Sequence, residues 1–334
     1  MKILICPLNW GLGHATRCVP IIQRLMAEGH ELVVATDGFP LAFLLQEFPT
    51  LRFIELPSYS ISYSSGNSQI SSMFFSIPNI IRGIIKEHFW LKKILKKEPF
   101  DQVISDNRFG LWNKQVHSIY ITHQLMVKMP RVLKMFEPLV WFIHRCFINR
   151  YNACWIPDNI GNNGLSGDLS HKYPLPTNAK FIGTQSRFRN MIDIQPDTRY
   201  EVAAIVSGIE PHRTIFEKSL LEKYRNADYR TLIISGQPQV GNTETNIENI
   251  TLVPHLSDVE IASVFLGAKK IISRSGYSTI MDLSALNCLQ KAEFFPTPGQ
   301  TEQEYLAKIH GRQNIDSAQP LTAVCRIIDV SLPD

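Results

Sequence analysis

The chain has 334 residues, of which 44% are hydrophobic, and its 34 Lys and Arg against 30 Asp and Glu give a formal net charge of +4. This length suggests two domains of ordinary size with conventional hydrophobic cores. The charge is too small to indicate nucleic-acid binding, so we expect no nucleic-acid partner. The sequence contains no uninterrupted apolar run of the roughly 18 residues that would predict a membrane-spanning helix.

The six cysteines are scattered along the chain without a Cys-x-x-Cys pair. The first strand is predicted to begin at Lys2, with no secretory leader before it. We therefore expect a reduced, cytoplasmic protein without a structural zinc site.

The first half of the sequence alternates short apolar runs with longer amphipathic stretches. KILICPL is followed by a predicted helix over about 15–28, and ELVVATD by a second helix over about 41–48. Such alternation predicts parallel strands joined by helices in a doubly wound sheet. Residues 1–184 are expected to form this first domain, with strands at 2–8, 31–37, 51–56, 101–106, 118–124, 152–158 and 179–184.

A second alternating series follows a polar, irregular segment. Residues 185–199 are predicted to be an interdomain linker, and residues 200–334 a second Rossmann-like domain. Its apolar runs are VAAIVS, TLIISG, ITLVPH, KKIISRSG and AEFFPTPGQ. Two such sheets leave a cleft beside the carboxyl ends of their strands, where ligands bind in open α/β folds.

A glycine-containing loop, Asn9-Trp10-Gly11-Leu12-Gly13-His14, follows the first strand directly. It lies where a Rossmann phosphate loop would lie, but Thr16 occupies the third glycine position of the dinucleotide motif. The loop therefore argues against a nicotinamide or flavin cofactor. It still predicts a tight turn that places His14 at a helix N-terminus beside the cleft.

His14 is a candidate general base, because the positive end of a helix dipole disfavours imidazole protonation and a neutral imidazole accepts protons. It could instead cap the helix or bind an acceptor phosphate. Asp106 ends another predicted strand and could reach the same cleft to orient His14. The alternative for Asp106 is a cap on the turn before Phe109.

The segment from Ile271 to Ala307 carries two polar motifs around one strand-turn-helix unit. Gly276 lies in a turn of small hydroxyl residues that begins a helix, where free N–H groups and the helix dipole favour a phosphate. Asp282 follows Ser278 by about one helical turn and could accept two ribose hydroxyls. The amides of Gln300 and Gln303 suit sugar hydroxyls.

Four motifs together resemble the GT-B glycosyltransferases of family 28, which are related to the N-acetylglucosaminyltransferase that forms lipid II. These motifs are GLGHATR at 11–17, SGIEPHRT at 207–214, SRSGYSTIMD at 273–282 and PTPGQTEQEY at 296–305. The resemblance spans both halves and implies two Rossmann-like domains facing a central cleft.

The resemblance also implies where a UDP-sugar binds. The 275–279 turn would face the diphosphate, Asp282 the ribose, and the 300–303 segment the transferred sugar, while Arg213 would neutralise phosphate charge and Leu256 would lie near the uracil. Motifs and resemblance together predict the donor-binding residues Gly11, Gly13, Ser207, Gly208, Arg213, Leu256, Ser275, Gly276, Ser278, Thr279, Asp282, Gln300, Glu302 and Gln303.

Two departures from the family leave the donor sugar open. The family usually carries Glu where Asp282 stands, and the loop at 286–291 replaces a shorter glycine-containing turn.

The predicted function is an inverting, metal-independent glycosyltransferase that uses a UDP-sugar as substrate, with no cofactor. His14 would deprotonate the acceptor with Asp106 as its orienting partner, while Arg213 and the 275–279 helix terminus would stabilise the departing diphosphate. No DxD pair lies in a matching loop. The alternatives are a UDP-sugar 2-epimerase of the same fold and a nucleotide-sugar-binding protein without catalysis.

Two segments of the first half mix large apolar residues with Lys and Arg, namely 80–97 and 128–150. Interfacial helices on anionic membranes have this composition, which predicts peripheral contact with the inner face of the cytoplasmic membrane and a lipid-linked or glycan acceptor of the cell envelope. The alternative is a pair of core-facing helices with solvated basic faces. Pro130 and Pro138 are expected to interrupt the second segment.

Overall fold

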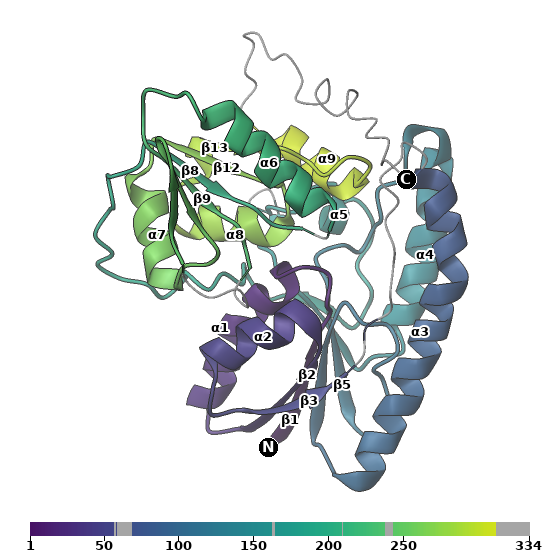
Figure 1. The fold of residues 1–334 in the computed structure, drawn as a ribbon. Helices are drawn as coiled ribbons and strands as arrows, with labels where there is room; N and C mark the ends of the chain where they lie inside the picture. Colours follow the sequence, from purple (N-terminus) through teal and green to yellow (C-terminus); the bar gives the residue numbers. More distant parts are fainter. Residues whose placement is uncertain (57, 59–68, 162–163, 209, 238–242, 312–334) are drawn as a thin grey trace, which may run out of the picture.

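Two sheets of mainly parallel strands, each covered by helices, build the protein (Figure 1). The computed structural model describes residues 1–56, 58, 69–161, 164–208, 210–237 and 243–311. Residues 312–334, at the end of the predicted second domain, lie outside the described residues. The predicted fold class, two Rossmann-like α/β units, is confirmed.

The first sheet has seven strands in the order β3-β2-β1-β4-β5-β6-β7, and all its pairings are parallel. Every strand predicted for this half is present. The strands are β1 Lys2–Pro7, β2 Glu31–Thr36, β3 Arg52–Glu55, β4 Gln102–Asp106, β5 His117–Ile121, β6 Ala153–Ile156 and β7 Ala179–Phe181. The helices are α1 Gly13–Ala27, α2 Gly38–Glu47, α3 Gln69–Lys97, the 3-10 helix η1 Arg131–Phe136, α4 Glu137–Ile148 and α5 Asp168–His171.

The second sheet has six strands in the order β10-β11-β9-β8-β12-β13, with only β10 and β11 antiparallel. Its strands are β8 Val202–Ile205, β9 Thr231–Ile234, β10 Thr245–Ile247, β11 Ile250–Val253, β12 Lys270–Ser273 and β13 Ala292–Phe294. Its helices are α6 His212–Tyr224, α7 Asp258–Gly267, α8 Tyr277–Ala285, the 3-10 helix η4 Leu289–Lys291 and α9 Thr301–His310. The polar edge strand β10 was not predicted, because three residues are too few to show an apolar alternation.

The predicted linker, residues 185–199, contains no helix or strand. It nevertheless packs tightly, since Phe188 is only 2% exposed and belongs to the hydrophobic cluster that includes Phe265 and Leu283. This segment is therefore attached to the second sheet rather than free between the two sheets.

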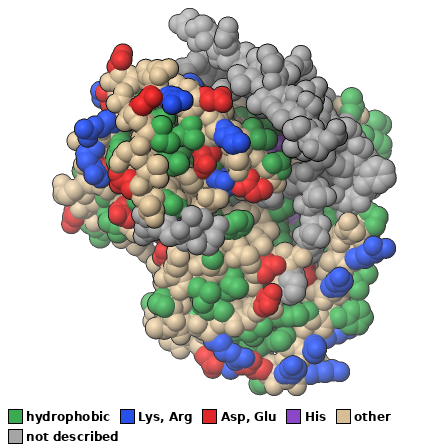
Figure 2. Space-filling model, viewed as in Figure 1, with side chains coloured by type: hydrophobic (Ala, Val, Ile, Leu, Met, Phe, Trp, Pro, Cys, Tyr) green, Lys and Arg blue, Asp and Glu red, His purple; other side chains and the backbone are tan. Residues whose placement is uncertain are grey.

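The two segments with mixed apolar and basic composition form α3 and the η1–α4 pair. As expected, the second segment is not one continuous helix, since it divides at Phe136. Figure 2 shows Lys and Arg side chains beside hydrophobic ones along the right-hand edge, where Figure 1 places α3. Within the described residues, no helix combines the length and the apolarity needed to cross a bilayer.

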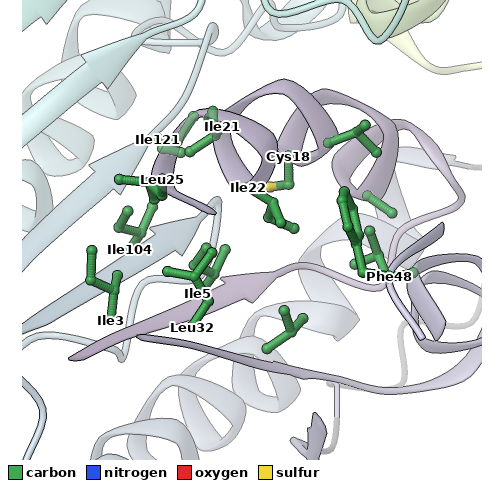
Figure 3. Packing of buried hydrophobic residues seen from close by; sticks show 14 of the residues in the cluster. Ile3, Ile5, Cys18, Ile21, Ile22, Leu25, Leu32, Phe48, Ile104 and Ile121 are labelled. Carbon is green, nitrogen blue, oxygen red and sulfur yellow. The ribbon is translucent and has the colours of Figure 1, made fainter. Parts of the chain in front are cut away.

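Strand β1 lies at the centre of the first core because its side chains are buried on both faces of the sheet. Ile3 and Ile5 pack toward α1, where they meet Cys18 and Ile22 (Figure 3). Leu4 and Cys6 point to the opposite face, which Leu91 of α3 covers. Each such aliphatic side chain stabilises the fold by about 1.5–3 kcal/mol, which fixes α1 and the loop before it against the sheet.

A buried ion pair fastens α3 to the end of β4. The Arg108 guanidinium is fully buried and donates to Glu87 Oε1 at 3.0 Å, while Glu87 Oε2 accepts from the Gly110 amide at 3.0 Å. Arg108 also donates to the Pro7 carbonyl at 3.2 Å, at the end of β1. The pair thus supports the strand ends from which the candidate site is built.

We expect Glu87→Ala to lower the free energy of unfolding by about 3–5 kcal/mol, because it removes the hydrogen-bonded carboxylate of the buried Arg108 charge and leaves only Asp37 at 3.8 Å. Urea denaturation followed by circular dichroism measures this change. Glu28→Ala is the matched control, since its half-exposed carboxylate lies 3.9 Å from Arg24 and its loss should change stability by less than about 0.5 kcal/mol. Equal stability of the two variants would contradict the structural role of Glu87.

Candidate functional site

The candidate site lies where the strand order reverses in each sheet. In the first sheet the chain runs from β1 outward to β2 and β3 and then returns to β4 on the other side of β1. In the second sheet β8 has β9 on one side and β12 on the other. Loops that leave neighbouring strands diverge at such points and leave a crevice at the carboxyl ends. A cavity of about 410 Å³ lies between the loops of the two sheets.

Most of the predicted site residues line this cavity, and they come from both sheets. From the first sheet these are Gly11, Gly13 and His14, and from the second Ser207, Gly208, Gly276, Ser278, Thr279, Asp282, Gln300, Glu302 and Gln303. Asp106 lies directly behind His14. Residues predicted from motifs up to 290 positions apart are thus brought to one place.

Arg213 requires a correction, because it does not line the cavity. Its guanidinium donates to Glu210 at 2.6 Å, to Glu217 at 3.0 Å and to the Ser235 carbonyl at 3.3 Å. Glu217, four residues after Arg213, lies on the same face of α6, and Glu210 lies just before the helix, so the two carboxylates together capture the charge of Arg213. The predicted role of Arg213 at a phosphate is therefore not supported, and the spacing of Glu210 and Glu217 already contained the signal.

Ser275 and Leu256 also lie away from the cavity. The Ser275 hydroxyl is buried and donates to the Gln303 carbonyl at 2.7 Å, which ties the β12–α8 turn to α9. Leu256 packs against the core cluster of the second sheet, while its neighbour His255 lines the cavity. Both predicted ligand contacts are replaced by structural ones.

The N-terminus of α8 faces the cavity without a side chain in the way. A Cβ added to Gly276 would meet only Thr279 Oγ1, at 4.0 Å, so the backbone here is open to a ligand. Ser278 donates to the Gly13 carbonyl at 2.7 Å, and a Cβ on Gly13 would come within 3.0 Å of Ser278 Oγ. Glycine at position 13 thus lets the N-termini of α1 and α8 approach each other, and both helix dipoles favour an anion between them.

Asp282 is held inside α8 at the cavity wall. Its Oδ1 accepts from the Ser186 hydroxyl at 2.7 Å, and its Oδ2 lies 3.4 Å from Arg187 Nε. Burial raises the pKa of Asp282 to about 6, although the Arg187 charge opposes this shift. The carboxylate can therefore accept hydroxyl groups fully only above about this pH.

Arg187 is a cavity residue that sequence reasoning missed. It lies in the predicted linker, yet its side chain is only 6% exposed, lines the cavity and pairs with Asp258 of α7. Within the described part of the chain its Nε donates no hydrogen bond. A single arginine in an irregular segment carries no spacing signal, so only the tertiary contacts reveal it.

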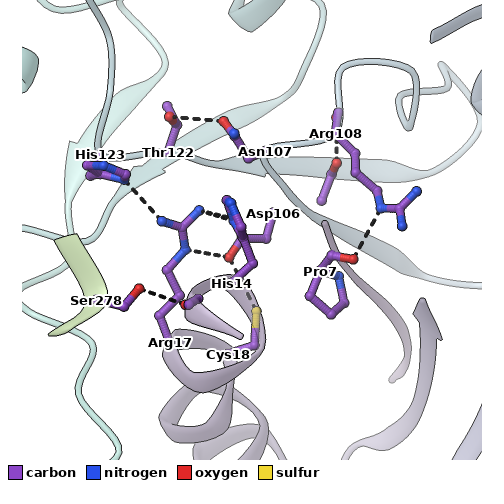
Figure 4. A network of polar contacts seen from close by, with 12 residues as sticks. Pro7, His14, Arg17, Cys18, Asp106, Asn107, Arg108, Thr122, His123 and Ser278 are labelled. Atoms are coloured by element: carbon purple, nitrogen blue, oxygen red, sulfur yellow. Dashed lines mark hydrogen bonds and ion pairs between the residues drawn. The ribbon is translucent and has the colours of Figure 1, made fainter. Parts of the chain in front are cut away.

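His14 and Asp106 meet as predicted, although 92 residues separate them. The strand register explains the contact, since Pro7 at the end of β1 pairs with Asp106 at the end of β4. His14 Nδ1 lies 2.9 Å from Asp106 Oδ1 (Figure 4). The carboxylate is fully buried, while the imidazole is 12% exposed toward the cavity.

Arg17 completes this group and was not predicted, although it ends the GLGHATR motif. Its Nε donates to Asp106 Oδ2 at 2.6 Å, and its Nη2 donates to Asp106 Oδ1. The same Nη2 lies 2.7 Å from His14 Nδ1. One helical turn separates His14 from Arg17, so both side chains reach the same carboxylate.

The charges in this group fix its protonation. Burial lowers the pKa of His14, and the positive charge of Arg17 lowers it further, with only partial opposition from Asp106. His14 is therefore neutral near pH 7, for reasons other than the helix dipole that the sequence suggested. Burial by itself would raise the pKa of Asp106, but Arg17 and His14 outweigh it, and the carboxyl group stays ionised.

His123 extends the network to the second sheet. Its Nδ1 lies 3.0 Å from Arg17 Nη1, its Nε2 lies 2.7 Å from Glu302 Oε1, and its ring stacks on Tyr277 with centroids 4.1 Å apart. Burial would raise the pKa of Glu302, but the interaction with His123, including its hydrogen bond, and the charge of Arg17 outweigh burial and lower it. A chain of polar contacts thus joins His14 in α1 to Glu302 in α9.

The two predicted amides hold each other at the cavity edge. Gln303 donates from Nε2 to Gln300 Oε1 at 2.6 Å and accepts the Thr297 amide at 2.8 Å. Within the described part of the chain the Gln300 amide nitrogen has no protein acceptor, so it can donate to a ligand. Among the described residues, no three His, Cys, Asp or Glu side chains group in a way that could hold a metal ion.

Known proteins share this architecture. No protein-family model matches the chain. Two sequences of Methanosarcina acetivorans, each named an uncharacterized glycosyltransferase, are 23% and 21% identical to this chain. Each alignment covers 92% of this chain, and the alignments cover 81% and 83% of the respective relatives. The solved spinosyn rhamnosyltransferase superposes with a TM-score of 0.57 at 12% identity, over 92% of this chain and 84% of that one. The chain has the GT-B fold.

Other GT-B structures resemble the chain to a similar degree. Arabidopsis thaliana UGT89C1 complexed with UDP-L-rhamnose gives a TM-score of 0.54 at 12% identity, over 92% of this chain and 82% of that one. A Listeria monocytogenes protein assigned as a UDP-N-acetylglucosamine 2-epimerase gives 0.51 at 10% identity, over 93% and 88%. The sequence relatives and most of these structures are named glycosyltransferases, which is the enzyme class that the sequence predicts.

Proposed function

We propose that the protein is an inverting, metal-independent glycosyltransferase that moves a sugar from a UDP-sugar to a glycan or lipid-linked acceptor at a membrane surface. One observation carries this proposal: a single cavity has His14 with its buried carboxylate on one wall and the open N-terminus of α8 with Asp282 on the other. The relation to family 28 and to lipid II synthesis is part of the proposal, as is the absence of a cofactor.

The donor binds against the second sheet. The amides at the start of α8 receive the diphosphate, and Asp282 accepts the ribose hydroxyls. Arg187 lines the cavity and pairs with Asp258 and Asp282, so it holds the Asp282 carboxylate in place beside the ribose. Gln300 and Glu302 face the sugar. The Arabidopsis structure of the same fold, complexed with UDP-L-rhamnose, supports a nucleotide sugar as the ligand class.

His14 removes the proton from the acceptor hydroxyl. A base needs an imidazole nitrogen with a free lone pair, so the His14 proton must lie on Nδ1, where it is donated to Asp106, and Nε2 must face the acceptor. The opposite tautomer, with Nδ1 accepting from Arg17, would turn Nε2–H into a donor toward an acceptor phosphate. The tautomer therefore separates the two roles considered for this residue.

The reaction is a single displacement. The acceptor oxygen attacks the anomeric carbon from the face opposite the diphosphate, its proton passes to His14 Nε2, and the bond from the anomeric carbon to the phosphate oxygen breaks with its electrons on UDP. The helix N-terminus then stabilises the departing charge. This stereochemistry gives an inverted product.

We expect His14→Ala to lower acceptor-dependent UDP release by about 100-fold or more, with the affinity for the UDP-sugar nearly unchanged, because only proton transfer is lost. A coupled UDP assay over a panel of UDP-sugars, with polyprenyl-linked and glycan acceptors, measures the rate. His30, which lies outside the cavity and pairs with Glu28, provides the control, since His30→Ala should leave the rate unchanged.

Four results would contradict the proposal. Normal turnover by His14→Ala would show that His14 is not the base. Loss of activity in EDTA that is restored by added metal would refute metal independence. A changed sugar without UDP release would indicate the epimerase. Binding of UDP-sugars without any reaction across the panel would indicate the non-catalytic alternative.

Donor affinity should also depend on pH. Because the pKa of Asp282 is raised to about 6, its carboxylate is protonated as the pH falls below that value and can no longer accept two hydroxyls. We expect the affinity for UDP-glucose, whose diphosphate stays ionised, to fall by about tenfold between pH 7 and pH 5. Asp282→Asn should bind more weakly at pH 7 and show no such dependence in isothermal titration calorimetry. A parallel pH dependence in the variant would refute the ribose role.

The membrane contact is proposed through exposed apolar side chains on the first domain. Ile81, Ile85 and Phe89 recur every fourth residue along α3 and are each at least half exposed, with Lys86 and Arg82 nearby in the sequence. Met135, Leu139 and Phe142, spaced three or four residues apart along η1 and α4, are also each more than half exposed. Trp112 contacts both His88 of α3 and Arg150 just after α4, so the two segments share one side of the domain.

We expect the protein to float with vesicles that contain anionic lipid and to stay in solution with neutral vesicles. Phe89→Glu combined with Phe142→Glu should reduce the floating fraction by at least about fivefold, because each substitution replaces apolar surface by a charge that anionic lipid repels. Ile192→Glu, at a still more exposed apolar site outside these helices, is the control. Absence of flotation in the wild type, or equal flotation of all variants, would remove the membrane contact.

A further inference from the structure

We propose that Arg17 is a positioning residue for His14: its fixed charge keeps the imidazole uncharged, and its planar fork holds the Asp106 carboxylate in the orientation that receives the Nδ1 proton. The catalytic consequence rests on the function proposed above. The effect on the protonation of His14 does not, and it can be measured without turnover.

The geometry of Arg17 supports this role before any chemistry is considered. Its side chain is 2% exposed, and it uses Nε and Nη2 on the two different oxygens of Asp106 while Nη1 meets His123. A guanidinium can make these contacts together because its donors lie in one rigid plane. A lysine ammonium would keep the charge but could not hold both oxygens and His123 in this way.

The charge of Arg17 changes what Asp106 can do for His14. In a simple pair, a carboxylate favours the protonated imidazole and so opposes a free base. Here the Asp106 charge is already matched by a permanent cation, and protonated His14 would lie 2.7 Å from that cation. The carboxylate can then orient the ring without promoting its protonation.

The charged and titratable groups around His14 come from four elements. Asp106 ends β4, Arg17 lies on α1 itself, His123 follows β5, and Glu302 belongs to α9. Glu302 is hydrogen-bonded to His123, and His123 to Arg17. Among the described residues, neither Glu302 nor His123 is hydrogen-bonded to the His14 ring. Arg17 is thus the cation in direct contact with the imidazole among the described residues.

NMR titration of the ¹⁵N-labelled histidines tests the proposal, with the His14 signal assigned by its loss in His14→Gln. In Arg17→Met we expect the His14 titration midpoint to rise by at least about one pH unit, because the repelling charge is gone and Asp106 is left to attract a proton. Arg24→Met removes an equally charged, half-exposed residue of the same helix and should leave the midpoint unchanged.

Arg17→Lys separates charge from geometry and covers the case in which Arg17→Met does not fold. We expect its His14 midpoint to stay near the wild-type value, while kcat falls by about tenfold with little change in KM for the UDP-sugar, since the carboxylate is no longer held at two points. A folded Arg17→Met with an unmoved midpoint, or an Arg17→Lys enzyme with wild-type kcat, would overturn the proposal.

These results remain distinct from a failure of the proposed function. If His14→Ala turns over normally, His14 is not the base, yet the NMR midpoints of the Arg17 variants still decide whether Arg17 controls its protonation.

Discussion

The buried carboxylate of Asp106 is the constraint around which the site is organised. A carboxylate with no exposure at the end of a central strand is costly unless positive and hydrogen-bonding partners surround it. Arg17 and His14, one turn apart at the start of α1, supply these partners. The requirement fixes α1 against β4, sets the direction of the glycine loop after β1, and places the imidazole at the cavity wall.

The closeness of the two domains follows from the small residues at their facing helix ends. Gly13 and Ser278 meet at hydrogen-bond distance, and His123 reaches across to Glu302 while its ring lies flat on Tyr277. These contacts bring two positive helix ends to one cavity. An anionic diphosphate is the ligand that such a field favours, and the same polar chain that holds the domains together ends on the candidate base.

Much of the fold could be read from the sequence because the inner strands β1, β2, β4 and β5 are buried on both faces and appear as short apolar runs. The edge strand β10 escaped, since its three residues are mostly polar and exposed. Within the site, motif positions such as Gly276, Asp282 and Glu302 reached the cavity as expected. Arg213 did not, because Glu217 on its own helix and Glu210 just before that helix pair with its guanidinium.

The sequence by itself determined the two α/β units, the glycine loop with His14 and the helix start with Asp282, since these depend on local periodicity and on residue types at turns. Only the tertiary structure decided which charges meet. Arg17 and Arg187 became site residues, and Arg213 and Ser275 became structural ones, through contacts with segments distant in sequence. Local spacing limits which side chains share a helix face, but the energy of a buried charge depends on every neighbour that folding brings to it.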